Sequence, residues 1–186
     1  MKRLLAVLVG IMVASGAMAE DSKPIAADSR PMQLSLTPNF AIFDRTATIE
    51  GLTLGIWSEN PQAALAVGIV NGSTGQSAGL SLGFILNYAD SYKGIQLALI
   101  NYTKSDFLGW QLGLVNYTEG SMKGLQTGVV NYAGRLTGLQ LGLINYAATA
   151  KTGVQIGLVN LIPQNELFTG LPAELAPGMV LINWRF

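Results

Sequence analysis

The chain has 186 residues, a formal net charge of zero and neither cysteine nor histidine, and only 12% of its residues are charged. Soluble domains carry about twice that fraction of charge, and a hydrophobic content of 49% is too high for a disordered chain. Without cysteine or histidine, the chain cannot form a Ser-His-Asp triad, a thiolate nucleophile, or a His- or Cys-ligated zinc or haem site, and it lacks the basic excess typical of nucleic-acid binding.

Residues 1–19 have the composition of a secretory signal peptide. A short basic start precedes an apolar stretch and an A-x-A cleavage site at residues 17–19. Because the apolar stretch is shorter than the roughly 20 residues of a membrane-spanning helix, we expect cleavage. Residues 20–31 are polar and contain two prolines, which predicts a flexible leader. Residues 32–186 are then expected to form a single β-repeat domain.

A repeated unit that begins with glycine and usually ends in Asn-Tyr dominates the rest of the chain. The clearest copies are 14 or 15 residues apart and begin at Gly94, Gly109, Gly124, Gly138 and Gly153. Strict alternation of residue types over nine positions, with β-branched and aromatic residues, predicts a β-strand in each copy. The copy at Gly79 has one extra residue before its asparagine, which predicts a β-bulge. The short polar segments between copies predict turns.

With the fainter copies and the terminal segments included, the repeats predict ten strands in an antiparallel meander closed into a barrel. Nine residues tilted by about 40° span about 23 Å, close to the roughly 25 Å apolar band of an outer-membrane barrel. The leucine-rich face would contact lipid, and tyrosines would form girdles at both membrane edges. Glycine and glutamine would fill the interior. The glutamines expected to form hydrogen bonds there are Gln96, Gln111, Gln126, Gln140 and Gln155.

The C-terminal segment supports the barrel by resemblance. Apolar residues alternate up to a terminal phenylalanine, as Val180, Ile182, Trp184 and Phe186. This pattern resembles the closing strand of small bacterial outer-membrane β-barrel proteins, in which a terminal aromatic strand is the recognition signal for the assembly machinery. The internal GLQLGLVNY-type units are similar to the short surface repeats of a poorly characterised group of bacterial envelope proteins. Together, these resemblances imply an envelope location and no biochemical activity.

The alternative fold is a parallel β-solenoid with one coil of about 15 residues per unit. Near-identical units stack naturally in such a fold, with leucine on leucine inside and asparagine on asparagine. The last strand also places Leu181 and Asn183 opposite Trp184 and Phe186, which conflicts with a lipid-facing leucine face in every strand. The low charge, the terminal strand and the long segment 163–176 favour the barrel.

No catalytic, cofactor-binding or metal-binding residue is predicted, and the sequence identifies no residue that would bind another ligand or a partner. The GLSLG segment at residues 79–83 has the spacing of a nucleophile elbow, but without histidine Ser81 is interpreted as a strand residue in the place of glutamine. The Asn-Tyr pairs recur in nearly every copy, so a structural role is expected for them. The scattered carboxylates are interpreted as solvated turn charges. They are Asp44, Glu50, Glu59, Asp90, Asp106, Glu119, Glu166 and Glu174.

We therefore expect a non-enzymatic protein of the outer membrane or cell surface with a structural or minor channel role. Membrane lipid is its expected partner, and neither a cofactor nor nucleic acid is expected. The alternative function is an exported soluble β-repeat module, in the periplasm or at the cell surface. Such a module would present a tyrosine- and asparagine-rich face to a protein or carbohydrate partner.

Overall fold

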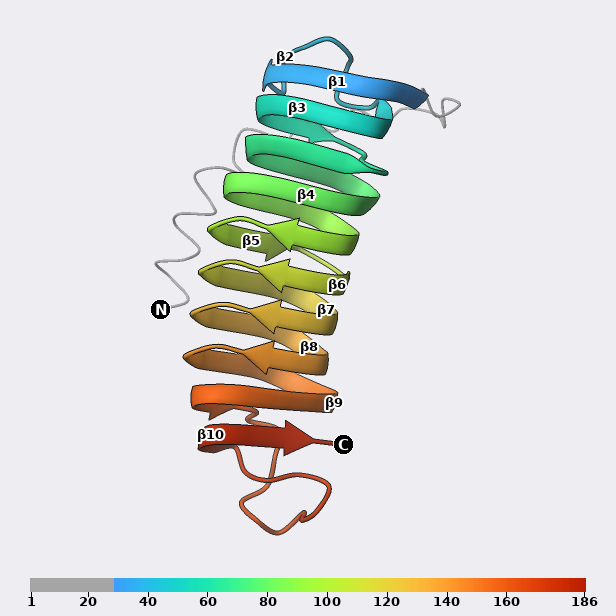
Figure 1. Cartoon of the computed structure of the whole chain (residues 1–186). Helices are drawn as coiled ribbons and strands as arrows, with labels where there is room; N and C mark the ends of the chain where they lie inside the picture. Colours follow the sequence, from blue (N-terminus) through green and yellow to red (C-terminus); the bar gives the residue numbers. More distant parts are fainter. Residues whose placement is uncertain (1–28) are drawn as a thin grey trace.

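The protein is a β-solenoid. The computed structural model describes residues 29–186, and Figure 1 shows their coils stacked along one axis between β1 and β2 at one end and β10 at the other. The expected signal peptide lies outside the described residues, and β1 begins at Ser29, within the expected leader. The strands are β1 (Ser29–Thr37), β2 (Phe40–Ala41), β3 (Thr48–Asn60), β4 (Leu65–Leu97), β5 (Ile100–Thr103), β6 (Phe107–Leu112), β7 (Val115–Thr127), β8 (Val130–Leu141), β9 (Ile144–Leu161) and β10 (Gly178–Arg185).

Strand pairing is parallel through the body of the solenoid. Every pair from β1–β3 through β8–β9 is parallel, and only the end pairs β1–β2 and β9–β10 are antiparallel. The order of strands in the sheet begins at β10 and ends at β2, and these end strands do not pair with each other. The all-β prediction is confirmed, whereas the closed antiparallel barrel is wrong and the parallel solenoid is the fold.

Equivalent residues of successive units stack in register. Asn116, for example, pairs with Asn131 in the next coil, and Asn131 pairs with Asn145. The extra residue of the unit at residues 79–88 lies at residues 84–85, where Phe84 and Ile85 are both exposed. Register is regained immediately, because Leu86 pairs with Ile100. The insertion predicted as a bulge is thus absorbed on the outside of the coil.

Each unit bends at a central Gly-Leu pair instead of forming one straight strand. Gly113 faces the interior, where a Cβ would lie 2.8 Å from Nδ2 of Asn101, whereas Leu114 is 53% exposed. Val115 is also partly exposed, and Asn116 is fully buried. The bend interrupts the alternation of a straight strand, so glutamine and asparagine, predicted to lie on opposite faces, both point inward. The interruption recurs at residues 98–99, 128–129 and 142–143.

Two columns of amide side chains occupy the interior. Successive members are linked by hydrogen bonds: Gln140 Nε2 donates to Gln126 Oε1 at 2.7 Å, and Asn116 Nδ2 donates to Asn131 Oδ1 at 2.8 Å. Such ladders satisfy buried amides only when identical side chains stack in register. The glutamine ladder consists of Gln96, Gln111, Gln126, Gln140 and Gln155, and the asparagine ladder of Asn71, Asn87, Asn101, Asn116, Asn131, Asn145 and Asn160.

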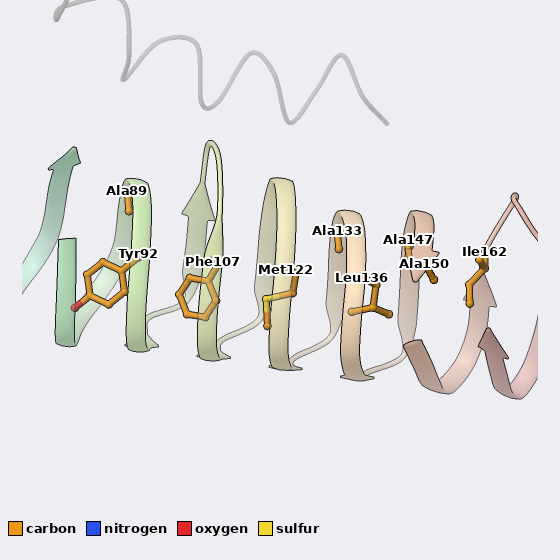
Figure 2. Packing of buried hydrophobic residues seen from close by; sticks show 9 residues of the cluster. All are labelled: Ala89, Tyr92, Phe107, Met122, Ala133, Leu136, Ala147, Ala150 and Ile162. Carbon is orange, nitrogen blue, oxygen red and sulfur yellow. The ribbon is translucent and has the colours of Figure 1, made fainter. Parts of the chain in front are cut away.

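A narrow apolar core lies beside the amide ladders (Figure 2). One of its columns runs through Tyr92, Phe107, Met122, Leu136 and Ala150, all buried. The rings of Tyr92 and Phe107 stack with centroids 6.1 Å apart. Among the described residues, buried polar side chains outnumber buried hydrophobic ones. Most protein interiors consist mainly of hydrophobic side chains. The interior of this solenoid is instead held together largely by hydrogen bonds.

The leucine-rich positions lie on the outside of the coils. Leu114 and Leu143, for example, are 53% and 50% exposed, so the expectation that a solenoid would stack leucine inside is wrong. The prediction of hairpin turns between the units is also wrong for several segments, because the β-strand continues through them. Arg135, for example, pairs in parallel with Thr149.

The C-terminal segment covers the last coil. Glu174, interpreted from sequence as a solvated charge, is buried and forms an ion pair with Arg185 of β10. Its carboxylate also accepts a hydrogen bond from the backbone N–H of Glu166 at 2.9 Å. The N–H of Phe186 donates to the carbonyl of Ala173 at 2.8 Å. These contacts fold the segment between β9 and β10 back onto the final strand.

Replacing one amide of the glutamine ladder tests whether the ladder stabilises the fold. We expect Gln126→Ala to lower the free energy of unfolding by about 3 kcal/mol, because it leaves buried partners unpaired and opens a cavity. The partners are Gln111, Gln140 and the carbonyl of Tyr132. The measurement is urea denaturation. The matched control Gln76→Ala, at an exposed position of β4, should change stability by no more than about 0.5 kcal/mol; equal effects would contradict a stabilising ladder.

Candidate functional site

The candidate site is an apolar line on the outer surface, at the bend between the two strand segments of each coil. We call this line of residues the apex row. Its members are 41% to 59% exposed. They are Leu99, Leu114, Val129, Leu143 and Leu158. Toward β3 the line continues with Ile56, Ile69 and Phe84, so exposed apolar side chains follow the bend along most of the rod.

A groove with a floor of glycine and, at residue 98, alanine runs beside the line of the apex row where this line passes β3 and β4. On its other side stand Leu97, Leu112 and their equivalents, which flank the buried glutamines. One hollow in the surface is lined by residues 67–68, 82–84 and 97–99. A second hollow at the β1 end is lined by the corresponding residues of earlier coils, with Phe40 and Ile42 added. Both hollows lie along the same line of the rod, and their walls are mainly aliphatic or aromatic, with Ser35 and Asn39 as polar lining residues at the β1 end.

Four tyrosines form a continuous stack on the other side of the apex row, and we call them the tyrosine row. They are Tyr102, Tyr117, Tyr132 and Tyr146. Neighbouring ring centroids are 5.9, 4.3 and 5.3 Å apart, with interplanar angles of 18° or less. Because the ring faces cover one another, the row presents ring edges and hydroxyl groups to its surroundings. The two separate girdles expected from the barrel are wrong, since equivalent tyrosines of successive coils pair in register.

The tyrosine row begins with a polar cluster around Tyr88. The Tyr88 hydroxyl donates a hydrogen bond to Glu59 and accepts one from Trp57 Nε1 at 3.0 Å. Glu59 also faces Arg45, with 3.7 Å between Oε1 and Nη2. The Tyr88 ring lies over Gly72, where any Cβ would clash with it. Burial and the hydrogen bond to the Glu59 carboxylate raise the pKa of Tyr88 above its ordinary value.

Burial also raises the pKa of two of the stacked tyrosines, Tyr102 and Tyr117. The pKa of Tyr117 is raised to about 12, chiefly by burial and then by the negative charges that Tyr132 and Glu119 carry when ionised. The pKa of Tyr102 is raised by burial and by its hydrogen bond to Glu119 Oε1, 3.0 Å from the Tyr102 hydroxyl. Glu119 belongs to the third side of the coil. The tyrosine row therefore marks the boundary between apolar and charged surface.

Charged side chains gather on this third side, which we call the charged side. They are exposed and include Asp90, Lys93, Lys104, Asp106, Glu119, Lys123, Arg135 and Lys151. One leucine, Leu108, shares this side and is 46% exposed between Lys93 and Lys123 of the adjacent coils. Leu108 thus matches the apex leucines in exposure but differs from them in its surroundings.

The carboxylates considered from sequence are spread along the rod, and most have local structural contacts. Asp44 Oδ1 accepts hydrogen bonds from the N–H and hydroxyl of Thr46, both at 3.0 Å, which hold the pKa of Asp44 below its ordinary value. Asp90 and Asp106 each accept a backbone N–H from a neighbouring coil. Within residues 29–186, no three carboxylates come close enough together to hold a metal ion.

Two sequence interpretations concern residues that the structure places inside. Ser81 is fully buried in the line of the glutamine ladder, and its hydroxyl donates to Asn87 Oδ1 at 2.9 Å, so its interpretation as a strand residue is confirmed. The asparagines of the Asn-Tyr pairs are also fully buried, and only the tyrosines reach the surface. The tyrosine- and asparagine-rich face of the alternative function is therefore wrong in composition.

Sequence reasoning missed the apex row and its groove. The signal was present at the fifth position of the units, which is glycine in most copies and alanine in the copy at Gly94, followed by an apolar residue. A glycine between two apolar positions marks a sharp bend or a close backbone approach, and a bend there exposes the residue that follows.

Scans against family models, curated proteins and solved structures found no match to this chain. Within residues 29–186, no helix is long and apolar enough to cross a membrane.

The raised pKa of Tyr117 predicts alkaline sensitivity. Folding favours the neutral phenol of Tyr117. Its contribution to the free energy of unfolding is therefore fully present below the pKa of about 10 in the unfolded chain, and it is lost as the pH rises toward the pKa of about 12 in the folded chain. We expect the free energy of unfolding to fall between these pH values, and to fall less in Tyr117→Phe. Urea denaturation across this range and the phenolate absorbance measure the effect. A folded chain whose tyrosines all titrate like those of the unfolded chain would contradict it.

Proposed function

We propose that this chain is a non-enzymatic, exported protein with a structural role at the outer membrane or cell surface, where its solenoid lies against membrane lipid. The observation that carries the proposal is the inverted distribution of side chains, with hydrogen-bonded amides inside and aliphatic rows outside. Monomeric soluble proteins rarely expose a continuous apolar patch of more than a few hundred Å². A surface of this kind is expected to be covered in the cell.

A structural role is favoured over a channel. The glutamine and asparagine ladders and the apolar core fill the inside of the coils, and their side chains are fully or almost fully buried. Ion or solute passage needs a water-lined lumen of the kind found in large barrels. Most of the described carboxylates are engaged in ion pairs and local hydrogen bonds, which supports a non-enzymatic role.

The second candidate function is an exported soluble module that binds a partner along the tyrosine row. The exposed hydroxyl groups favour a partner that recognises hydrogen-bonding groups repeated along the rod. Recognition of carbohydrate through aromatic ring faces is disfavoured, because neighbouring tyrosines already cover one another's faces at 4.3 to 5.9 Å. This candidate leaves the apex row uncovered, and we therefore rank it second.

Cell fractionation tests the proposal. We expect the protein expressed in a Gram-negative host to sediment with the outer membrane, to remain there after a high-salt wash, and to be released by detergent. Resistance to salt is expected because apolar contact, unlike attraction between exposed charges, is not screened by ions. Quantitative immunoblotting of each fraction provides the measurement, with a soluble periplasmic protein as control. Recovery mainly in the periplasmic fraction without detergent would support the soluble module instead.

A further inference from the structure

We propose that the apex row and its adjacent groove form a lipid-insertion edge, by which the rod lies parallel to the membrane plane and enters one leaflet. This inference rests on the proposed function and specifies which residues of the solenoid contact hydrocarbon. The apex leucines enter deepest, the tyrosine row lies at the level of the headgroups, and the charged side remains in water. The partner is a lipid surface of any headgroup charge.

The order of residue types around the coil matches the polarity gradient of a membrane surface. Leu114 and Leu143 at the apex have no charged residue beside them in the adjacent coils, where Leu99, Val129 and Leu158 occupy the same position. The tyrosines follow three positions later along the coil, and the charged side comes next. Tyrosine is enriched at membrane interfaces because its ring is apolar and its hydroxyl polar.

Backbone hydrogen bonding at the apex permits contact with hydrocarbon. The N–H groups of Leu114 and Val115 both donate to the carbonyl of Leu99, at 2.9 and 3.0 Å. Those of Val129 and Val130 bind the carbonyl of Leu114 in the same way. An unsatisfied backbone group costs several kcal/mol in hydrocarbon. The bends of the solenoid satisfy these donors within the molecule and present their side chains outward.

The shape of this surface favours lipid over a second copy of the chain. Ten strands stacked at a spacing of about 4.8 Å give a rod about 45 Å long. On each coil, the outward-facing part from the first apolar position of the unit to the tyrosine is about 23 Å wide. The product of the two lengths gives an apolar area of order 1,000 Å². This area is comparable with the roughly 800 Å² per partner of a standard interface, so shape and not area separates the two occupants. Two convex edges touch along a line, whereas fluid hydrocarbon fits around both flanks of the apex.

Electrostatic attraction to anionic headgroups is not expected to hold the protein at the membrane. The chain has a formal net charge of zero. On the charged side, carboxylates lie among the basic residues as far as Glu119, and the three basic residues that follow, Lys123, Arg135 and Lys151, are fewer than the roughly four to eight of a lipid-binding cluster. Recruitment by anionic headgroups requires clustered basic residues and weakens with salt. Insertion through the apex row is therefore expected to proceed equally well on zwitterionic and anionic lipid.

Vesicle flotation of matched variants tests the insertion edge. The chain as isolated from expressing cells, with its N-terminus determined by mass spectrometry, is mixed with phosphatidylcholine vesicles or with vesicles that also contain phosphatidylglycerol. We expect Leu114→Thr/Leu143→Thr to lower the partition coefficient about thirtyfold, because two leucines leave hydrocarbon. Leu108→Thr should partition like the wild type. Threonine already occupies an outward position at residue 127, and circular dichroism and urea midpoints verify that each variant folds.

The possible outcomes separate this inference from the proposed function. Equal binding to both vesicle types between about 0.1 and 1 M salt, lost only in the apex variant, supports it. Binding restricted to anionic vesicles, or unchanged by the apex substitutions, overturns it. Failure to bind vesicles together with self-association in sedimentation, abolished by the apex substitutions, identifies a second copy as the occupant and also overturns it. If fractionation still places such a protein in the membrane, its structural role there stands through a protein partner, and the proposed contact with lipid does not.

Discussion

The in-register stacking of buried amides is the constraint on which the rest of this structure depends. Most glutamines and asparagines inside the coil are bonded to the same group of the next coil, which lies directly beside them. Gln126 and Asn131 show this well, because each donates both to its counterpart in an adjacent coil and to a backbone carbonyl. Coil length, the glycine bends and the near identity of the repeats all follow from preserving this register.

The amide interior also determines the character of the surface. With the inward positions of both strand segments largely taken by polar side chains, the apolar residues of each unit remain outside. Neighbouring coils partly shield one another's aliphatic side chains, but the apex row at the bend remains 41% to 59% exposed. A folded interior that relies on hydrogen bonds thus produces a molecule whose apolar surface needs a partner.

Sequence reasoning gave the fold class, the repeat and the inward glutamines, because alternation and spacing are local properties. It did not distinguish barrel from solenoid, since the same nine-residue pattern satisfies an antiparallel meander and a parallel stack. The feature that distinguishes the solenoid from the barrel is the bend at pairs such as Gly113-Leu114. One extra outward residue there reverses the inward–outward alternation of the side chains. That bend depends on contacts with adjacent coils, such as the N–H of Gly113 donating to Thr127, and these are not encoded in a single unit. The terminal aromatic strand misled for a similar reason, because β10 alternates like a closing strand but pairs only with β9.

The antiparallel ends give the rod a defined length. β2 and β10 break the parallel repeat, and the Glu174–Arg185 pair holds the last segment over the final coil. Between these ends every coil meets nearly identical neighbours, so gain or loss of a 15-residue unit would alter the rod by about 4.8 Å without changing any local contact. The number of repeats can therefore vary independently of the stability of each coil. Length is the one property of this molecule that duplication of a short DNA segment could adjust on its own.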